Sequence, residues 1–191
     1  MLYIEHIKKE LKPSTIEDVI NEINKFINKQ AYVIMITGPP RTGKTSLAYN
    51  IIKYWRNSSI GKNNQIFRLG LDKNGQKNRL NKYKKYIKNK VSIVLDDGCH
   101  TQKLRLSYLK TAFENNTAVL FIEVNCGLQM AKVFNHVHVE ESNRDDVYLH
   151  KLEDYYAYRS QYEEPAINNN LHTMIYTPII DERPAVIKLR Y

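Results

Sequence analysis

The chain has 191 residues and a mass of 22.5 kDa, which predicts one ordinary domain, 1–191, with a full hydrophobic core. A hydrophobic fraction of 42%, with only 7 Gly and 6 Pro, excludes a disordered, collagen-like or low-complexity chain. Two cysteines, Cys99 and Cys126, without a secretory signal sequence favour a reducing, intracellular compartment. No run of 18 apolar residues occurs in the sequence, so a membrane span is not expected.

Basic residues outnumber acidic ones, with 29 Lys and Arg against 20 Asp and Glu, and the formal net charge is +9. The excess is concentrated between Arg56 and Lys90, where eleven Lys or Arg accompany a single acid, Asp72. Such a segment is either a surface that binds nucleic acid or a solvated face rich in Lys and Asn. Both interpretations predict that the segment is exposed.

The first third of the chain predicts a helix, a strand and a second helix. A capping box at Ser14 and apolar residues at helical spacing predict an amphipathic helix over 14–27, inside an N-terminal lead-in of residues 1–30. The apolar run 31–36 predicts a buried strand that ends before Gly38. From Lys44 an apolar stripe predicts the next helix, which ends at a polar cluster.

The remaining chain alternates strand and helix patterns. Strands are predicted over 65–71, 91–95, 118–124 and 137–139, and helices over 80–90, 104–113, 128–134 and 145–162. The last stretch, 170–191, differs, because 173–176 and 185–189 predict two terminal strands that could form a hairpin. We therefore expect a three-layer α/β fold: a mostly parallel sheet, helices on both faces, and extra C-terminal strands.

A phosphate-binding motif lies between the first predicted strand and the helix that follows it. The segment 38–45, GPPRTGKT, fits G-x-x-x-x-G-K-[ST] at every fixed position. Its glycines turn main-chain N–H groups toward phosphate, Lys44 reaches the β and γ oxygens, and the Thr45 hydroxyl is a ligand for Mg²⁺. The sequence thus predicts a site for ATP and Mg²⁺. The expected nucleotide-binding residues are Gly38, Pro39, Pro40, Arg41, Thr42, Gly43, Lys44, Thr45 and Ser46.

Two acids follow the strand predicted over 91–95. A phosphate loop of this kind needs a carboxylate on a neighbouring strand to hold the magnesium shell, and Asp96 is the candidate. Asp97 could orient or deprotonate an attacking water. Alternatively, Asp97 is a helix cap or turn residue ahead of Gly98.

Asn125 ends the strand predicted over 118–124. It would lie beside the γ-phosphate if that strand is next to the phosphate-loop strand, and would then sense the nucleotide; the alternative is a plain turn asparagine. With Lys44 and Asp97, it completes the predicted catalytic set.

An arginine that neutralises transition-state charge can come from the same chain or from a neighbour in a ring. Arg105, Arg144 and Arg159 are the candidates, whereas Arg41 lies within the phosphate loop itself. A homo-oligomer is therefore expected, because a subunit this small offers no second wall for the nucleotide.

Over about residues 14–145 the chain resembles the P-loop NTPases. The segment GPPRTGKTSLA is similar to the ATPase branch with an extra strand between the phosphate-loop strand and the acidic strand, which holds the AAA+ proteins and viral genome-packaging motors. The stretches 91–125, 133–152 and 172–191 resemble the packaging ATPases of large and medium DNA viruses. This resemblance implies Mg-dependent ATP hydrolysis coupled to nucleic-acid binding or translocation.

A second resemblance is to small P-loop kinases of the polynucleotide-kinase and seryl-tRNA-kinase type. The segments DDGCHTQKLRLSYL, FIEVNC and YEEP are similar to their motifs. This alternative implies phosphorylation of a hydroxyl on a nucleic acid or small molecule, with Asp72 as the base and Arg144 in a lid. A third hypothesis is a nucleotide-binding regulator that does not turn over.

Overall fold

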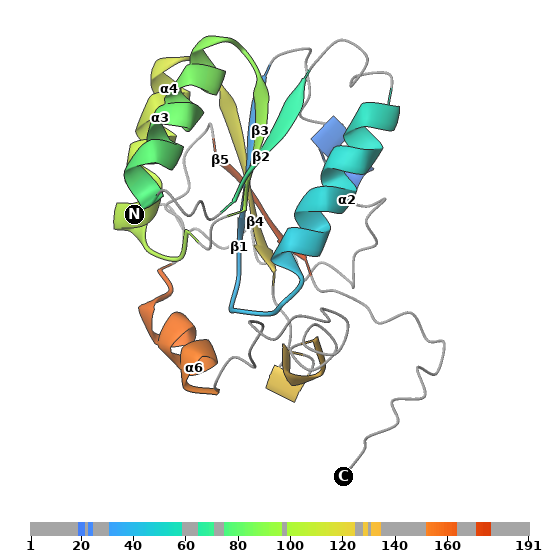
Figure 1. Ribbon diagram of the computed structural model, residues 1–191, viewed down its shortest axis with the longest axis vertical. Helices are drawn as coiled ribbons and strands as arrows, with labels where there is room; N and C mark the ends of the chain where they lie inside the picture. Colours follow the sequence, from blue (N-terminus) through green and yellow to red (C-terminus); the bar gives the residue numbers. More distant parts are fainter. Residues whose placement is uncertain are drawn as a thin grey trace, which may run out of the picture.

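A computed structural model of the chain contains a central parallel sheet between two layers of helices (Figure 1). It describes residues 19–21, 23–24, 31–58, 65–70, 75–96, 99–124, 128–129, 131–134, 152–163 and 171–176. Within these residues, no helix is both long enough and apolar enough to cross a membrane.

Five strands, all paired in parallel, form the sheet in the order β2-β3-β1-β4-β5. The strands are β1 (Tyr32–Thr37), β2 (Ile66–Gly70), β3 (Ser92–Asp96), β4 (Ala118–Val124) and β5 (Leu171–Tyr176). Every residue of β1 and β3 is buried, because helices cover both faces of the sheet. This explains why these strands have continuous apolar runs instead of an alternating pattern.

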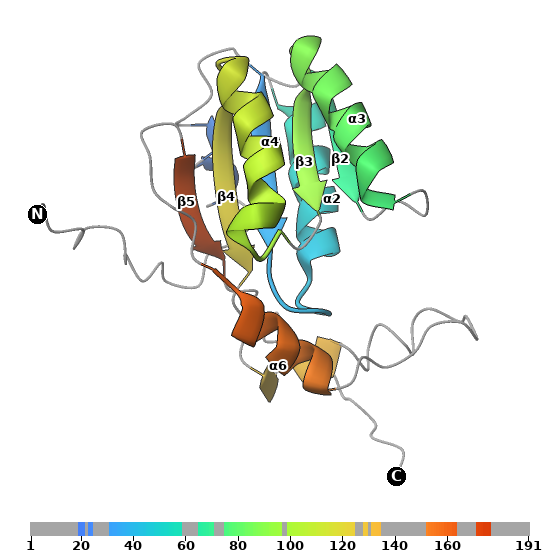
Figure 2. The same cartoon turned by 90° about the vertical axis from the view of Figure 1, so that its left-hand side faces the viewer.

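The helices divide between the two faces of the sheet. They are α2 (Lys44–Asn57), α3 (Gly75–Lys88), α4 (Gln102–Glu114) and α6 (Leu152–Gln161). On one face, α2 packs through Leu47, Ile51 and Trp55 together with Val19 and Ile23 of a helical N-terminal segment. On the other face, α3 and α4 lie side by side (Figure 2), and α6 lies beyond the carboxyl ends of the strands.

The predicted three-layer α/β fold is confirmed, with differences at some element boundaries. The helix expected over 80–90 begins earlier, at Gly75. Its first turn is polar and has no apolar stripe, so the sequence pattern did not reveal this start. In the terminal region, β5 pairs in parallel with β4. The strands predicted over 137–139 and 185–189 lie outside the described residues.

The order of the strands corrects one expectation. The resemblance to the packaging ATPases implied an extra strand between the phosphate-loop strand and the acidic strand. Instead, β1 pairs directly with β3, with Ile36 opposite Asp96, and β4 lies on the other side of β1. Strand order depends on contacts between distant segments, so the apolar runs alone could not reveal it. The topology does not support the packaging-ATPase resemblance and is compatible with the kinase resemblance.

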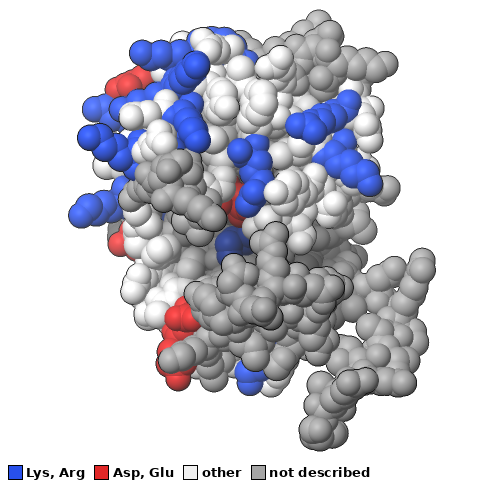
Figure 3. All heavy atoms as spheres, viewed as in Figure 1, with Lys and Arg blue, Asp and Glu red and all other residues white. Residues whose placement is uncertain are grey.

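The solvent side of α3 is strongly basic, as the sequence predicted. Basic side chains gather over α3 and α4 in Figure 3. The exposed lysines of α3 are Lys77, Lys82, Lys84, Lys85 and Lys88. Its opposite side packs Tyr83 and Ile87 into the core. Among the described residues of 56–90, two basic residues depart from the expected exposure: Arg79 is buried and Arg68 is half-buried.

The packing of β1 predicts a clear stability difference between two truncations. Ile34 is 1% exposed, so Ile34→Ala should lower the free energy of unfolding by about 2–5 kcal/mol through lost burial and a residual cavity. Leu106 is 65% exposed on α4, and Leu106→Ala should change it by less than about 0.5 kcal/mol. Urea unfolding followed by circular dichroism measures both. Equal losses would show that this face of β1 is not part of the core.

Candidate active site

The loop between β1 and α2 has the backbone that its two fixed glycines allow. Gly43 has φ 85°, in the left-handed region that favours glycine. Gly38 lies against β4, where an added Cβ would be 2.7 Å from the carbonyl oxygen of Val124. The glycines therefore permit both the sharp turn into α2 and the close approach of the loop to β4.

Hydrogen bonds within the loop hold its shape. The Thr42 hydroxyl donates to the Pro39 carbonyl at 2.9 Å, and the Lys44 Nζ donates to the same carbonyl at 2.5 Å. No side chain caps the start of α2, and no acid occurs in its first turn. The first N–H groups of a helix have no partner within the helix, so this turn suits an anion such as phosphate.

Two oxygen groups meet where this loop faces the end of β3. The Thr45 hydroxyl, at the start of α2, donates to Oδ2 of Asp96 at 2.8 Å. The direct pairing of β1 with β3 brings them together, because both strands end at the same edge of the sheet. A hydroxyl and a carboxylate are the hard oxygen ligands that Mg²⁺ prefers, so these two residues fit the predicted magnesium site.

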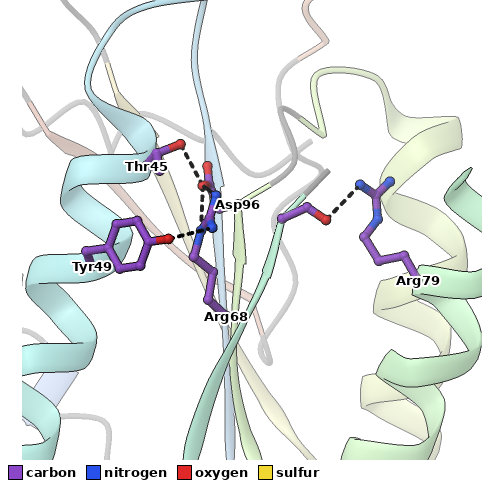
Figure 4. Close-up of polar contacts among 6 residues, drawn as sticks. Thr45, Tyr49, Arg68, Arg79 and Asp96 are labelled. Atoms are coloured by element: carbon purple, nitrogen blue, oxygen red, sulfur yellow. Dashed lines mark hydrogen bonds and ion pairs between the residues drawn. The ribbon is translucent and has the colours of Figure 1, made fainter. Parts of the chain in front are cut away.

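The same carboxylate oxygen has a further partner, Arg68 of β2 (Figure 4). Its Nη2 and Nε donate to Oδ2 of Asp96 at 2.8 and 3.0 Å. Its Nη1 donates to the Tyr49 hydroxyl of α2 at 3.1 Å, and the guanidinium lies 4.8 Å from the centre of the Tyr49 ring. Arg68 thus connects the acidic strand end to α2.

A second arginine supports the end of β2 from the other side (Figure 4). Arg79 of α3 is 5% exposed, and its Nη1 donates to the Gly70 carbonyl at 3.5 Å. Its Nε donates to the Tyr108 hydroxyl of α4 at 3.0 Å. These contacts fix the position at which the chain leaves β2.

Side chains of α6 and of Tyr162, the residue after it, bind the carboxyl ends of β1 and β4. The Tyr158 hydroxyl lies 2.6 Å from Oγ1 of Thr37, the last residue of β1. The Tyr162 hydroxyl donates to Glu123 of β4 at 2.8 Å, and Arg159 lies 3.5 Å from the same carboxylate. The helix is therefore anchored directly beside the start of the phosphate loop.

Arg105 of α4 completes this attachment and is 1% exposed. Its Nη1 donates to the Cys99 carbonyl at 2.9 Å, and its Nη2 donates to the Glu163 carbonyl at 2.6 Å. Burial lowers the pKa of the guanidinium, while the nearby Tyr162 acts in the opposite direction. Arg105 thus contacts main-chain carbonyls of its own chain, and Arg159 pairs with Glu123 of its own chain as well.

Other predicted residues divide into those that the structure places and those it does not describe. The loop residues 38–46 and Asp96 lie together at the edge described above. Asp72, Asp97, Asn125 and Arg144 lie outside the described residues. The strand that precedes Asn125 does pair with β1, which was the condition for its proposed role.

The sequence alone did not identify the roles of Arg68, Tyr158 and Glu123 at this edge of the sheet. No local signal identified Arg68, because Gly70, two residues further along the same face of β2, lies opposite Asp96 only once β2 and β3 have paired. The same holds for Tyr158, which approaches β1 from 121 positions further along the chain.

Comparison with known proteins supports the fold. No family model matches the chain, and no curated protein matches it in sequence. The structure is similar to Kti12 of Chaetomium thermophilum in complex with ADP-AlF3, with a TM-score of 0.55 and 18% identity over 75% of this chain and 89% of that one. It is also similar to a "putative kinase" of Chloroflexus aurantiacus, with a TM-score of 0.51 and 11% identity over 78% and 88% of the two chains. The chain therefore shares its three-layer α/β fold with these two proteins.

The attachment of α6 predicts a loss of stability at alkaline pH. Burial raises the pKa of Tyr158 to about 12 from the ordinary 10.0, although its hydrogen bond with Thr37 lowers the pKa in part. Below pH 10 the Tyr158 phenol is protonated in both the folded and the unfolded protein. Between pH 10 and 12 it ionises in the unfolded chain but stays protonated in the folded one. The free energy of unfolding therefore falls as pH rises through this range.

Chemical unfolding at several pH values between 9 and 12 measures this dependence. Tyr158→Phe should make the slope of the unfolding free energy against pH shallower, by the equivalent of up to about one proton per molecule. Tyr156→Phe, at a site 54% exposed on the same helix, should leave this slope unchanged. Identical slopes for the parent and the Tyr158 variant would contradict the placement of this phenol.

Proposed function

We propose that this chain is a magnesium- and ATP-dependent phosphotransferase that acts on a hydroxyl group. The observation that carries the proposal is the 2.8 Å hydrogen bond from Thr45 of the phosphate loop to Asp96. This hydrogen bond joins the phosphate loop, which follows β1, to the acidic end of β3. The two strands pair directly, without the extra strand of the ATPase branch between them. A fold shared with the Chloroflexus protein favours the kinase over the hydrolase.

Each residue of the site has a separate role in binding a triphosphate and transferring its γ-phosphate. Main-chain N–H groups at the start of α2 would donate to phosphate oxygens, and the positive charge of Lys44 would balance the β and γ phosphates. Thr45 and Asp96 would hold Mg²⁺, which would supply positive charge to stabilise the charge that develops on the transferring phosphoryl group. Asp72, two residues after the end of β2, is the proposed base for the acceptor hydroxyl. In phosphoryl transfer most of the catalysis comes from such positioning and charge stabilisation.

The proposal predicts where the γ-phosphate goes. With γ-labelled ATP and Mg²⁺, label should move to an acceptor such as an oligonucleotide with a 5′-hydroxyl end or a panel of small alcohols. Lys44→Met and Asp96→Asn should each reduce transfer by about a hundredfold or more, because each removes charge stabilisation of the transferring phosphoryl group. Lys53→Gln is the matched control, since Lys53 is exposed on the same helix and should leave the rate unchanged.

Two other outcomes of this assay would overturn the proposal. Label released only as free phosphate, faster when nucleic acid is present, would make the protein an ATPase of the motor type. Nucleotide that binds without any turnover would make it a regulator.

We also propose that the acceptor or partner is a single-stranded nucleic acid held on α3. No acid occurs from 75 to 90, so the exposed lysines of α3 create an uninterrupted positive surface. Beside them Phe67 of β2 is 37% exposed and stacks on Tyr86 of α3, with ring centroids 5.1 Å apart and planes 7° apart. Positive charge next to accessible aromatic rings is the usual combination for single strands, because bases stack on the rings while lysines pair with phosphates.

The alternative, a solvated lysine face, gives a different response to salt. Binding of a labelled oligonucleotide should weaken as salt rises, with a slope in log–log form of about −0.7 for each phosphate contacted. A combined Lys84→Gln, Lys85→Gln and Lys88→Gln variant should reduce the slope by about 2. Lys53→Gln, on α2 at the opposite face of the sheet, should change it little. A flat salt response in the parent protein would identify α3 as a solvated face.

A further inference from the structure

We infer that Arg68 is a built-in counter-ion of Asp96 that must leave the carboxylate before Mg²⁺ can bind there. The exchange would then set the Mg²⁺ concentration that the site requires. This inference rests on the proposed magnesium–nucleotide site and adds a residue that the phosphate-loop motif does not contain.

Asp96 is a buried carboxylate. Its side chain is 3% exposed, and a buried carboxylate is costly unless it is paired and hydrogen-bonded. Arg68 supplies the positive charge at 2.8 Å, and Thr45 supplies a hydroxyl donor. Without a metal ion, the ion pair with Arg68 satisfies this carboxylate.

All three of these hydrogen bonds end on the same oxygen. Oδ2 of Asp96 accepts from the Thr45 hydroxyl and from two nitrogens of Arg68, at 2.8, 2.8 and 3.0 Å. A carboxylate oxygen has about two lone-pair positions, so three donors fill it. A metal ligated by Thr45 and this oxygen needs the place that the guanidinium occupies, and two cations so close together repel each other.

Arg68 has a second anchor. Its Nη1 already contacts the Tyr49 hydroxyl, and the ring face of Tyr49 lies under the guanidinium. Tyr49 is 57% exposed and the Arg68 side chain is 28% exposed, so the guanidinium can move toward solvent and keep the aromatic contact. Arg68 therefore loses only part of its interactions when it leaves Asp96.

Gly70 gives an independent means of moving the guanidinium. A Cβ added to Gly70 would lie 2.8 Å from Nη2 of Arg68, the far end of a flexible side chain. Gly70→Ala should thus displace the guanidinium and keep its charge. Its backbone is not in the left-handed region, because Gly38 and Gly43 are the described glycines with positive φ.

The experiment measures the binding of a fluorescent ADP analogue at equilibrium, first in EDTA and then over a series of Mg²⁺ concentrations. The affinity in EDTA should be the same, within about twofold, for the parent, Arg68→Gln, Gly70→Ala and the control Lys53→Gln. The Mg²⁺ concentration for half-maximal enhancement of binding should fall about tenfold in Arg68→Gln and Gly70→Ala, the size expected when a charged hydrogen-bonded competitor is lost. It should not fall in Lys53→Gln.

Thermal unfolding provides a second readout. Without ligand, Arg68→Gln should unfold at a lower temperature than the parent, because Asp96 loses its counter-ion. Addition of Mg²⁺ and ADP should raise its unfolding temperature by more than it raises that of the parent, since binding stabilises the native state by mass action.

The outcomes separate this inference from the proposed function. If the parent binds no nucleotide under any condition, the proposed function fails. If it binds nucleotide but Arg68→Gln and Gly70→Ala need as much Mg²⁺ as the parent, or more, Arg68 is not a competitor and the inference alone is wrong. If Arg68→Gln does not fold, Gly70→Ala decides, because it moves the guanidinium but retains the arginine and its charge.

Discussion

The direct parallel pairing of β1 with β3 is the constraint on which the candidate site depends. Ile36 lies opposite Asp96, so the phosphate loop that leaves β1 and the carboxylate that ends β3 reach the same edge of the sheet. Both strands are buried on both faces and are held in register by main-chain hydrogen bonds. A shift of one residue would turn Asp96 toward the other face and separate it from Thr45.

The carboxyl edge of the sheet is completed by a segment that follows it in the chain. Thr37 and Glu123, at the ends of β1 and β4, have polar side chains where buried strands meet the loops. Tyr158 of α6 and Tyr162, just after this helix, provide their partners, and the buried Arg105 of α4 donates to the carbonyl of Glu163 at the end of this segment. Polar groups at a buried edge must be hydrogen-bonded, so the attachment of α6 is part of what keeps the phosphate loop in place.

The sequence was informative wherever the signal was local. The glycines and Lys44 of the loop follow from backbone conformation and charge over eight residues, and the apolar runs identified β1, β3 and β4 within one or two residues. The order of the strands was not accessible in this way, because β1 and β3 are separated by some 60 positions and any buried strand can pair with any other. The same limit hid Arg68 and Tyr158, whose roles exist only once distant elements have come together.

Asp96 brings the two requirements of such a site into conflict. Phosphate binding favours positive charge from Lys44 and the start of α2, whereas a metal ion needs a negatively charged carboxylate at a buried position. A lone carboxylate would be unstable there, and a carboxylate permanently neutralised by a rigid partner would bind a metal poorly. Arg68 meets both requirements, because it neutralises Asp96 through a flexible, partly exposed side chain. The guanidinium of Arg68 also contacts the ring of Tyr49. The carboxylate can therefore be stable without ligand and still open to exchange.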